Sequence, residues 1–343
     1  MENIIIPTSI QRPFFAPIIP STEVIPHPAF QRIPEQPVKN LPFIEANTKE
    51  VTLSHLQDDC IIPVFSKDNE VTISHQSFIS TILDAAKDAF PYETIASPIV
   101  RVSHVVKGRI PEAIHKPVSQ LLESDKTIYY ERMMFCIEVP TIFEDIDGCR
   151  LHLTIGGVRA YNEQNLYSRK SPEKFRIFIG FKNMVCCNLC ISTDGYKATL
   201  KVMDTTGLQT AASELFRSYD MTQHIRLMSA YRDCSMSETQ FAQFLGKCRL
   251  YQYLPLAERK KLPEILITDT QIGLVAKSYF DDPAFGKGNG NAISLWKVFN
   301  LITGANKSSY IDNFLDRAQN AGSLTTGLCR AINGDPEYSW FLQ

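Results

Sequence analysis

The sequence predicts an α+β fold, in which an antiparallel β-meander in the middle of the chain packs on a C-terminal helical region. Apolar and polar residues alternate between residues 97 and 203, and Asp147-Gly148 and Asp194-Gly195 supply two hairpin turn signals in that range. From Thr205 onward the apolar residues recur at helical spacing instead. A run of strands followed by a run of helices indicates an α+β protein, whereas alternating strands and helices would indicate a parallel sheet.

Residues 1–45 are expected to form a proline-rich leader without regular structure. They hold nine of the 20 prolines of the chain and contain no glycine and no hydrophobic period. Proline lacks a backbone N–H and fixes φ, so such a stretch favours an extended, polyproline-like chain. The leader also carries the apolar pairs Phe14-Phe15 and Phe43-Ile44. The alternative is therefore a strap that lies on the folded body or on a partner.

Residues 46–203 are predicted to form an αβ unit followed by the antiparallel sheet. A strand is expected over Cys60–Phe65, and Ser74 is placed to cap a helix that ends near Phe90. The alternation then predicts strands over residues 98–106, 126–140, 150–161, 175–191 and 196–202. We expect one face of this sheet to be solvated and basic.

Residues 204–343 are predicted to form a helical region packed on the sheet. Ser237 and Gln240 fit a capping box, and Asp269 is placed to cap a later helix. Near the C-terminus the pattern predicts two helices, one that is closed by Gly322 and one over residues 324–332.

The charge and cysteine content limit the class of protein. The net charge of −2 argues against a strongly basic nucleic-acid-binding protein, although residues 97–201 carry 15 Lys and Arg against 11 Asp and Glu, a local charge of +4. No apolar run approaches the roughly 20 residues that span a bilayer, and no signal peptide is visible. The nine cysteines are irregularly spaced in apolar surroundings, which is typical of reduced thiols. We therefore expect a cytoplasmic protein without membrane contact.

A basic, tyrosine-containing loop is the leading candidate site. Single-stranded nucleic acid is bound by cations that neutralise phosphates and by aromatic rings that stack on bases. The residues with that chemistry are Arg159, Tyr161, Tyr167, Arg169, Lys170, Lys174, Arg176 and Lys182. The alternative is an ordinary solvated hairpin loop.

A glycine-rich loop is the second candidate site, for an anion or a protein partner. It precedes a predicted helix, whose free N–H groups could hold an anion. Its residues are Gly286, Lys287, Gly288, Asn289 and Gly290. Their spacing does not match a dinucleotide-binding fingerprint, so a plain surface loop is the alternative.

No catalytic residue, metal site or cofactor is predicted. The C-x-x-C of Cys187 and Cys190 has no second pair of ligands at zinc-binding spacing. Residues 304–308 resemble the end of a phosphate-binding loop but lack its first glycine. An enzyme is the less favoured class, although it stays open because active sites assemble from distant residues.

Three stretches of the chain resemble a family of uncharacterised proteins, the domain of unknown function 3871. They are Tyr129–Met133, Lys182–Cys190 and Asn291–Asp312, and the resemblance extends from about Ile62 to the C-terminus. Val-Cys-x-Asn at residues 185–188 and Trp-x₃-Asn-x₂-Thr at residues 296–303 are also similar to a broader phage- and plasmid-like family of unknown function. The resemblance implies a protein of plasmids and conjugative elements of gut anaerobes and supplies no catalytic residue.

The sequence therefore favours two functions for the protein. The leading hypothesis is a mobile-element accessory protein that handles nucleic acid through the basic loop, with single-stranded nucleic acid as the candidate partner. The alternative is a protein-binding module or host-defence antagonist without catalytic activity, whose partner is a host protein. The sequence does not predict the oligomeric state.

Overall fold

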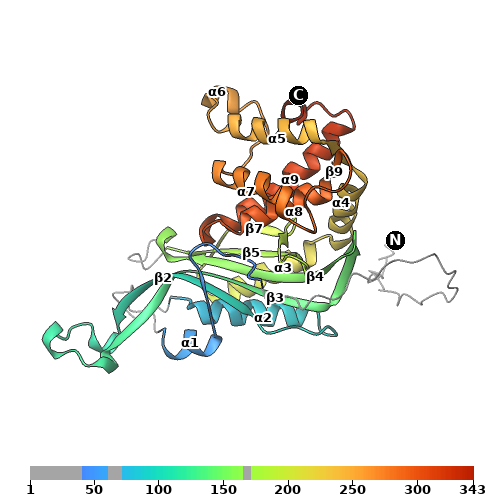
Figure 1. The fold of residues 1–343 in the computed structure, drawn as a ribbon. Coiled ribbons are helices and arrows are strands. Elements are labelled where there is room, and N and C mark those ends of the chain that lie inside the picture. Colours follow the sequence, from blue (N-terminus) through green and yellow to red (C-terminus); the bar gives the residue numbers. More distant parts are fainter. Residues whose placement is uncertain (1–40, 61–71, 165–170) are drawn as a thin grey trace, which may run out of the picture. The chain divides into compact units, whose positions relative to one another are not determined.

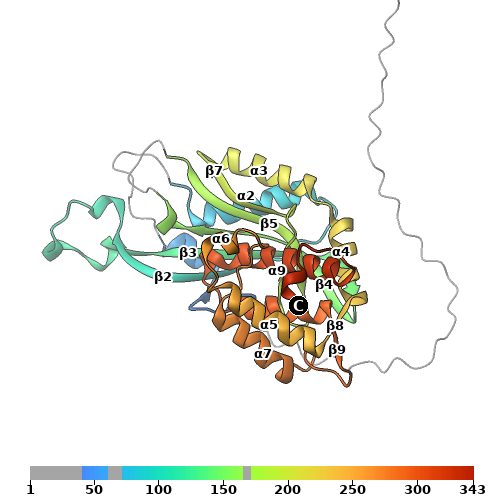
Figure 2. The ribbon, with the colours of Figure 1, turned by 90° about the horizontal axis from the view of Figure 1, so that it is seen from above.

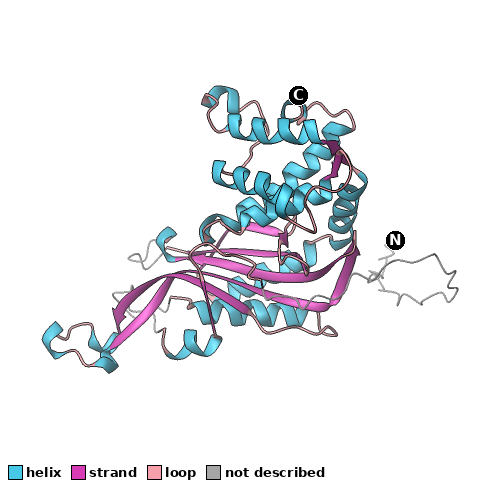
Figure 3. Cartoon of the chain, in the orientation of Figure 1, coloured by secondary structure: helices cyan, strands magenta, loops and turns pink. Residues whose placement is uncertain are grey.

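The computed structural model describes residues 41–60, 72–164 and 171–343 (Figure 1). The chain divides into two units, Met1–Lys39 and Asn40–Gln343, and every described residue lies in the second. This unit contains an antiparallel sheet in the middle of the chain and helices that follow it, as Figure 3 shows by secondary structure. The predicted α+β class is therefore confirmed.

The main sheet has seven strands that follow the order of the sequence. The path is β1-β2-β3-β4-β5-β6, and β7 pairs with β5 as well. Every pairing is antiparallel, which confirms the predicted meander. The strands are β1 (Lys49–Val51), β2 (Ile99–Arg109), β3 (Lys126–Ile146), β4 (Cys149–Ala160), β5 (Glu173–Asn183), β6 (Leu189–Cys190) and β7 (Tyr196–Val202).

The turn between β3 and β4 forms where the sequence predicts it. Asp147 and Gly148 both have positive φ, 51° and 75°, as a two-residue hairpin turn of type I′ requires. Ile146 pairs with Cys149 directly across this turn. The register shifts once, between Val139 and Phe143, and β3 therefore continues six residues beyond its predicted end at Pro140.

The predicted strand over residues 175–191 is wrong in its second half. The chain turns after Asn183, and β6 folds back to pair with β5. Cys187 lies in this turn with φ 58°. Asp194-Gly195 does reverse the chain, but β7 pairs with β5 instead of with the strand just before the turn. Alternation alone missed the turn because its residues Met184–Cys187 are themselves largely apolar.

Two helices cover one face of the sheet. They are α2 (His75–Ala89) and α3 (Thr205–Ser218), and Ser74 caps α2 as predicted. Phe78 of α2 packs edge-on against Phe135 of β3, with ring centroids 5.1 Å apart. The short helix α1 (Leu53–Asp58) contacts α2.

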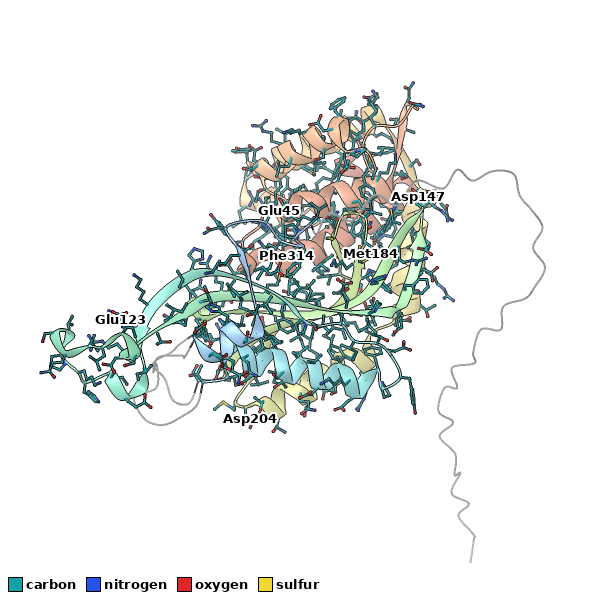
Figure 4. All side chains as sticks on the ribbon, turned by 60° about the horizontal axis from the view of Figure 1, so that its bottom comes forward. Glu45, Glu123, Asp147, Met184, Asp204 and Phe314 are labelled. Atoms are coloured by element: carbon teal, nitrogen blue, oxygen red, sulfur yellow. The ribbon has the colours of Figure 1, made fainter. Side chains whose placement is uncertain are left out.

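The opposite face of the sheet is covered by α9 (Ile311–Ile332). Ile311, Phe314 and Leu315 pack against the sheet residues Met134 and Phe178, and Figure 4 labels Phe314. Both faces are therefore buried over the central strands, and the prediction of a solvated, basic face is wrong. A strand pattern with one solvated face is expected only where no later segment packs on the sheet.

The remaining helices lie on the side of α9, away from α2 (Figure 1). A two-stranded ribbon of β8 and β9 joins them. The predicted capping box of Ser237 and Gln240 is confirmed, whereas Thr268, rather than Asp269, caps α7. The elements are α4 (Met221–Asp233), β8 (Ser235–Ser237), α5 (Glu238–Tyr251), α6 (Leu256–Arg259), α7 (Asp269–Asp281), β9 (Ala292–Ser294) and α8 (Leu295–Asn306).

The two predicted C-terminal helices are a single helix. α9 passes through Gly322 without a break. A Cβ at Gly322 would lie 3.2 Å from the carbonyl oxygen of Ile191, so the glycine allows the helix to approach the chain after β6. This packing explains why a glycine lies inside the helix, at a position where the local pattern predicts a helix end.

The predicted leader is too long at its C-terminal end. Phe43 and Ile44 are buried against the sheet and α9, and the N–H groups of Glu45 and Ala46 donate to the carbonyl oxygen of Lys307 at 2.9 and 3.2 Å. Residues 41–46 therefore follow the strap alternative. The predicted strand over Cys60–Phe65 lies outside the described residues except for Cys60.

Candidate binding surfaces

Two members of the predicted nucleic-acid-binding set are buried. Arg159, near the end of β4, is fully buried between the rings of Tyr161 and Phe175, at 4.5 and 4.6 Å from their centroids. Its guanidinium forms an ion pair with Glu173 at the start of β5. Burial raises the pKa of Glu173, although the charge of Arg159 opposes this. Arg159 and Tyr161 therefore do not offer a cation and a ring to solvent.

Two further cations of the set are ion-paired. Arg176 donates to Glu163 at 2.9 Å, and Lys182, which is buried, donates to Glu138 at 2.5 Å. Burial lowers the pKa of Lys182, but the hydrogen bond and charge of Glu138 outweigh this and hold the pKa above its usual value. Arg176 and Lys182 are thus both charged, but a carboxylate already balances each charge.

Lys174 is exposed, and its Nζ donates to the carbonyl oxygen of Glu163 at 3.0 Å. Tyr167, Arg169 and Lys170 lie outside the described residues. The structure therefore brings the described members of the set to neighbouring strands without forming a cluster of free cations. Nucleic-acid binding by this loop stays a prediction.

The glycine-rich loop does not lie directly before a helix. The strand β9 separates it from the first residue of α8, and the side chain of Ser294 caps that helix. Lys287 forms a 2.7 Å ion pair with Glu238, and Lys297 donates to the carbonyl oxygen of Gly286 at 3.2 Å. Gly288, Asn289 and Gly290 are exposed. The loop joins α7 to β9, and its use as an anion or partner site stays a prediction.

The structure reveals a surface that the sequence analysis missed, a β-ribbon that extends beyond the rest of the sheet. β2 and β3 pair with each other as far as Arg109 and Lys126. The pairing of β1 with β2 stops at Val102, and the pairing of β4 with β3 stops at Arg132. We call residues 103–131 the arm. Figures 1 and 2 show it reaching past the helices on both sides of the sheet.

The tip of the arm, residues 110–125, is folded by its own hydrogen bonds. Lys116 and Asp125 form a 2.7 Å ion pair, and Asp125 also accepts from the N–H of Leu122 at 2.9 Å. Arg109 donates to the carbonyl oxygen of Lys116 at 2.7 Å. Three 3-10 turns, Pro111–Ala113, Val118–Gln120 and Glu123–Asp125, complete the tip. The surface of the tip is therefore ordered before any partner binds.

Large apolar side chains are exposed on the arm. Val118 and Leu122 at the tip are 75% and 62% exposed, and Val105 and Ile114 are 54% and 38% exposed. Exposed apolar residues scattered singly need no explanation, but a group of them on one projecting element is typical of a binding surface. Figure 4 shows the tip, with Glu123 labelled, at the far end of the arm from Phe314.

The arm begins at a distorted residue. His104 has φ 56°, which is uncommon for a residue with a side chain, and it is not paired with β3 although its neighbours Ser103 and Val105 are. Its Nδ1 lies 3.0 Å from the hydroxyl of Ser103. Beyond this point no strand among the described residues pairs with the outer edge of β2, and an unpaired edge of this kind is a template for a further strand.

The charges of the arm balance. Its four carboxylates equal its four cations in number, and two of the cations are paired within the arm, Lys116 with Asp125 and Lys126 with Glu123. Arg109 is held by backbone carbonyl groups. Phosphate backbones are bound by several free cations, which the arm lacks. Its chemistry therefore favours a protein over a nucleic acid.

The placement of the His, Cys, Asp and Glu side chains bears on metal binding, and the burial of the thiols bears on their reactivity. Among residues 41–60, 72–164 and 171–343, no group of three His, Cys, Asp or Glu side chains is placed to hold a metal ion. Burial raises the pKa of Cys186 to about 12 and that of Cys190 further, so neither is a thiolate at neutral pH. No helix of the described part is long and apolar enough to cross a bilayer.

One family model matches residues 32–342 of the chain. Its description is "Domain of unknown function, B. Theta Gene description (DUF3871)", and the match covers most of the sequence, so the chain belongs to this family. No curated protein and no solved structure matches the chain.

Proposed function

We propose that this member of the DUF3871 family is a protein-binding accessory protein, which docks the arm on a partner protein. The observation that carries the proposal is the exposure of Val105, Ile114, Val118 and Leu122 on a projecting, ordered ribbon. Apolar anchors on a preordered element supply most of the binding energy in many protein interfaces, because little conformational freedom is lost on binding.

The structure of the ribbon supports the same partner class. A two-stranded hairpin alone is marginally stable in water, and its edges attract further strands. The outer edge of β2 beyond Val102 can accept an extended segment of a partner by β-strand addition, while Val118 and Leu122 fill an apolar pocket. We expect both contacts to form on one partner protein.

The accessory role on a mobile element, which the resemblance implies, belongs to this proposal. A host protein is the partner that such an element would target. Nucleic-acid handling is the competing function, and it would depend on Lys174 and the undescribed Arg169 and Lys170. The two functions differ in salt dependence, because phosphate binding weakens steeply as salt is added and apolar docking does not.

Site-specific crosslinking tests the proposal. A photo-reactive amino acid at Val118 should crosslink to one host protein, whereas the same group at Tyr92, which is 97% exposed on the body, should not. The purified partner should then bind the wild-type protein, and its Kd should rise about a hundredfold in the Val118→Ser/Leu122→Ser variant.

The exposed residue Met203 provides the matched control. A Tyr92→Ser/Met203→Ser variant should bind the partner with the wild-type Kd. If the Val118→Ser/Leu122→Ser variant bound the partner with the wild-type Kd, the proposal would be contradicted. It would also be contradicted if the wild-type protein bound oligonucleotides but no protein, with an affinity that falls steeply as salt is added.

A further inference from the structure

A cavity of 320 Å³ lies where α4, α8, α9 and the segment after β6 meet. Its volume is within the range of about 300–1,000 Å³ that is usual for small-molecule sites. It is separate from the arm in sequence and in the elements that form it. Its lining residues are Ile191, Ser192, Thr193, His224, Leu227, Tyr231, Phe299, Gly322, Ser323, Thr326, Gly327, Arg330, Glu337 and Tyr338.

His224 contributes a hydrogen-bonding ring nitrogen to this cavity. Its Nδ1 lies 2.7 Å from the hydroxyl of Tyr219, and that hydroxyl has no other hydrogen bond in the described part of the chain. With the tyrosine hydroxyl as the donor to Nδ1, Nε2 carries the ring proton, and with Nδ1–H as the donor, Nε2 is an acceptor. Burial lowers the pKa of His224 to about 4, so the ring is neutral at pH 7. No hydrogen bond joins Nε2 to another described residue, so this nitrogen can bond a ligand in either role.

Two hydroxyl groups add further donors. The side-chain amide of Gln319 donates to Thr193 at 2.9 Å and to Ser323 at 2.8 Å, so both hydroxyl oxygens act as acceptors there. The hydroxyl protons of Thr193 and Ser323 have no acceptor among the described residues. Tyr231, by contrast, uses its own proton on the carbonyl oxygen of Gly322 at 3.1 Å.

The charges at the cavity are already balanced. Arg330 pairs with Asp335 at 3.2 Å and also with Glu337. One cation therefore faces two carboxylates, and the cavity offers no free positive charge to an anion. Leu227, Phe299 and parts of the other lining side chains supply an apolar wall.

We propose that this cavity binds an uncharged small molecule that combines an apolar ring with hydrogen-bond-accepting oxygen or nitrogen atoms, the chemistry of a nucleoside. The polar groups of His224, Thr193 and Ser323 match the hydrogen-bonding atoms of such a ligand. The apolar wall matches its ring.

Equilibrium dialysis tests the proposal with adenosine, guanosine, cytidine and uridine as probes and inorganic phosphate as the anionic comparison. At least one nucleoside should bind saturably to the full chain, and phosphate should not. His224→Leu removes one hydrogen-bonding group and should weaken nucleoside binding about threefold to tenfold. His224→Gln keeps an N–H donor and should bind more tightly than His224→Leu.

A second variant avoids the buried histidine, in case its replacement disturbs folding. Ser323→Phe places a ring in the cavity and should abolish binding, while Thr222→Ala on the exposed side of α4 should leave it unchanged. Thermal unfolding checks that each variant is folded. Absence of nucleoside binding, binding of phosphate alone, or nucleoside binding that survives Ser323→Phe would overturn the proposal.

Discussion

Arg159 is a buried cation whose charge is balanced by the single carboxylate of Glu173. Removing one partner of such a pair leaves an uncompensated charge in the interior, which costs about 3–5 kcal/mol. We therefore expect Glu173→Ala to lower the free energy of unfolding by about that amount, measured by urea denaturation. Glu173 also accepts from the N–H of Ile73 at 2.9 Å, and the loss of this bond adds to the effect.

The exposed pair of Arg150 and Asp145 is the control for this measurement. Their side chains are about half exposed, and such pairs contribute little because water and salt screen them. Asp145→Ala should therefore leave the unfolding midpoint nearly unchanged. Equal effects of Asp145→Ala and Glu173→Ala would show that Arg159 is not held as the structure indicates.

Two buried histidines should make the stability of the protein depend on pH. Burial, assisted by the charge of Arg159, lowers the pKa of His75 to about 3, and burial lowers that of His224 to about 4. Both pKa values return to about 6.5 in the unfolded chain, which therefore binds more protons below that pH. The free energy of unfolding should fall as the pH drops below about 6.5, by about 2 kcal/mol for each histidine between pH 7 and pH 5.

Urea denaturation at the two pH values measures this loss. His224→Gln should remove about 2 kcal/mol of it, because glutamine does not titrate. His115→Gln, at an exposed position on the arm, should leave it unchanged. If the His224→Gln variant lost as much unfolding free energy between pH 7 and pH 5 as the wild type, His224 would not be a source of the pH dependence.

The roles of single cations could not be predicted from the sequence. Arg176 lies 13 residues from Glu163, and Lys182 lies 44 residues from Glu138. The pairing of separate strands, which the sequence does not specify, decides which cations meet a carboxylate. The Lys and Arg residues of this region therefore predict a basic surface from the sequence. In the fold, Arg176 and Lys182 instead form ion pairs with carboxylates.

At the scale of elements, Gly156 in β4 allows neighbouring strands to approach closely. A Cβ at this position would lie 2.1 Å from the carbonyl oxygen of Phe135, a backbone atom that cannot move alone. Gly156→Ala should therefore lower the free energy of unfolding by about 1–3 kcal/mol or more. Gly273 in α7 has no atom within 4 Å of such a Cβ, so Gly273→Ala should raise it by about 0.5–1 kcal/mol. Equal effects in thermal unfolding would contradict this packing.

Elements defined by local chemistry were predicted well, and those defined by tertiary packing were not. Ser74 and Ser237 cap their helices because a hydroxyl next to free N–H groups is a local signal. A local pattern places a helix end at Gly322, because it does not show that the glycine allows a close approach to Ile191. The arm could not be predicted either, because it too is defined by tertiary structure. Its strands pass the body only because β1 and β4 stop pairing at Val102 and Arg132.

At the scale of the whole unit, residues 41–46 tie the start of the described chain to its C-terminal helices. Phe43 and Ile44 are buried, and burying each such side chain contributes about 1.5–3 kcal/mol. A chain that begins at Thr48 should therefore lose about 3–6 kcal/mol of unfolding free energy relative to one that begins at Asn40. Equal melting temperatures of the two truncations would contradict this packing.

The arm and the body should be separable in their effects on the molecule. The tip at residues 110–125 makes its ion pairs and turns within the arm, and Ala113 is its buried apolar residue. The core of the unit lies between the sheet and the helices on its two faces. Loss of the tip should therefore remove the apolar anchors Ile114, Val118 and Leu122 without unfolding the protein.

Replacement of residues 110–125 by Asn-Gly tests the central claim most directly, because Arg109 pairs with Lys126 and a two-residue turn can join them. The measurement is the Kd of the purified partner for this variant, beside its free energy of unfolding. We predict that the free energy of unfolding stays within about 1 kcal/mol of wild type while binding weakens about a hundredfold or more. A folded variant that binds the partner with unchanged Kd would contradict the assignment of the arm as the binding surface.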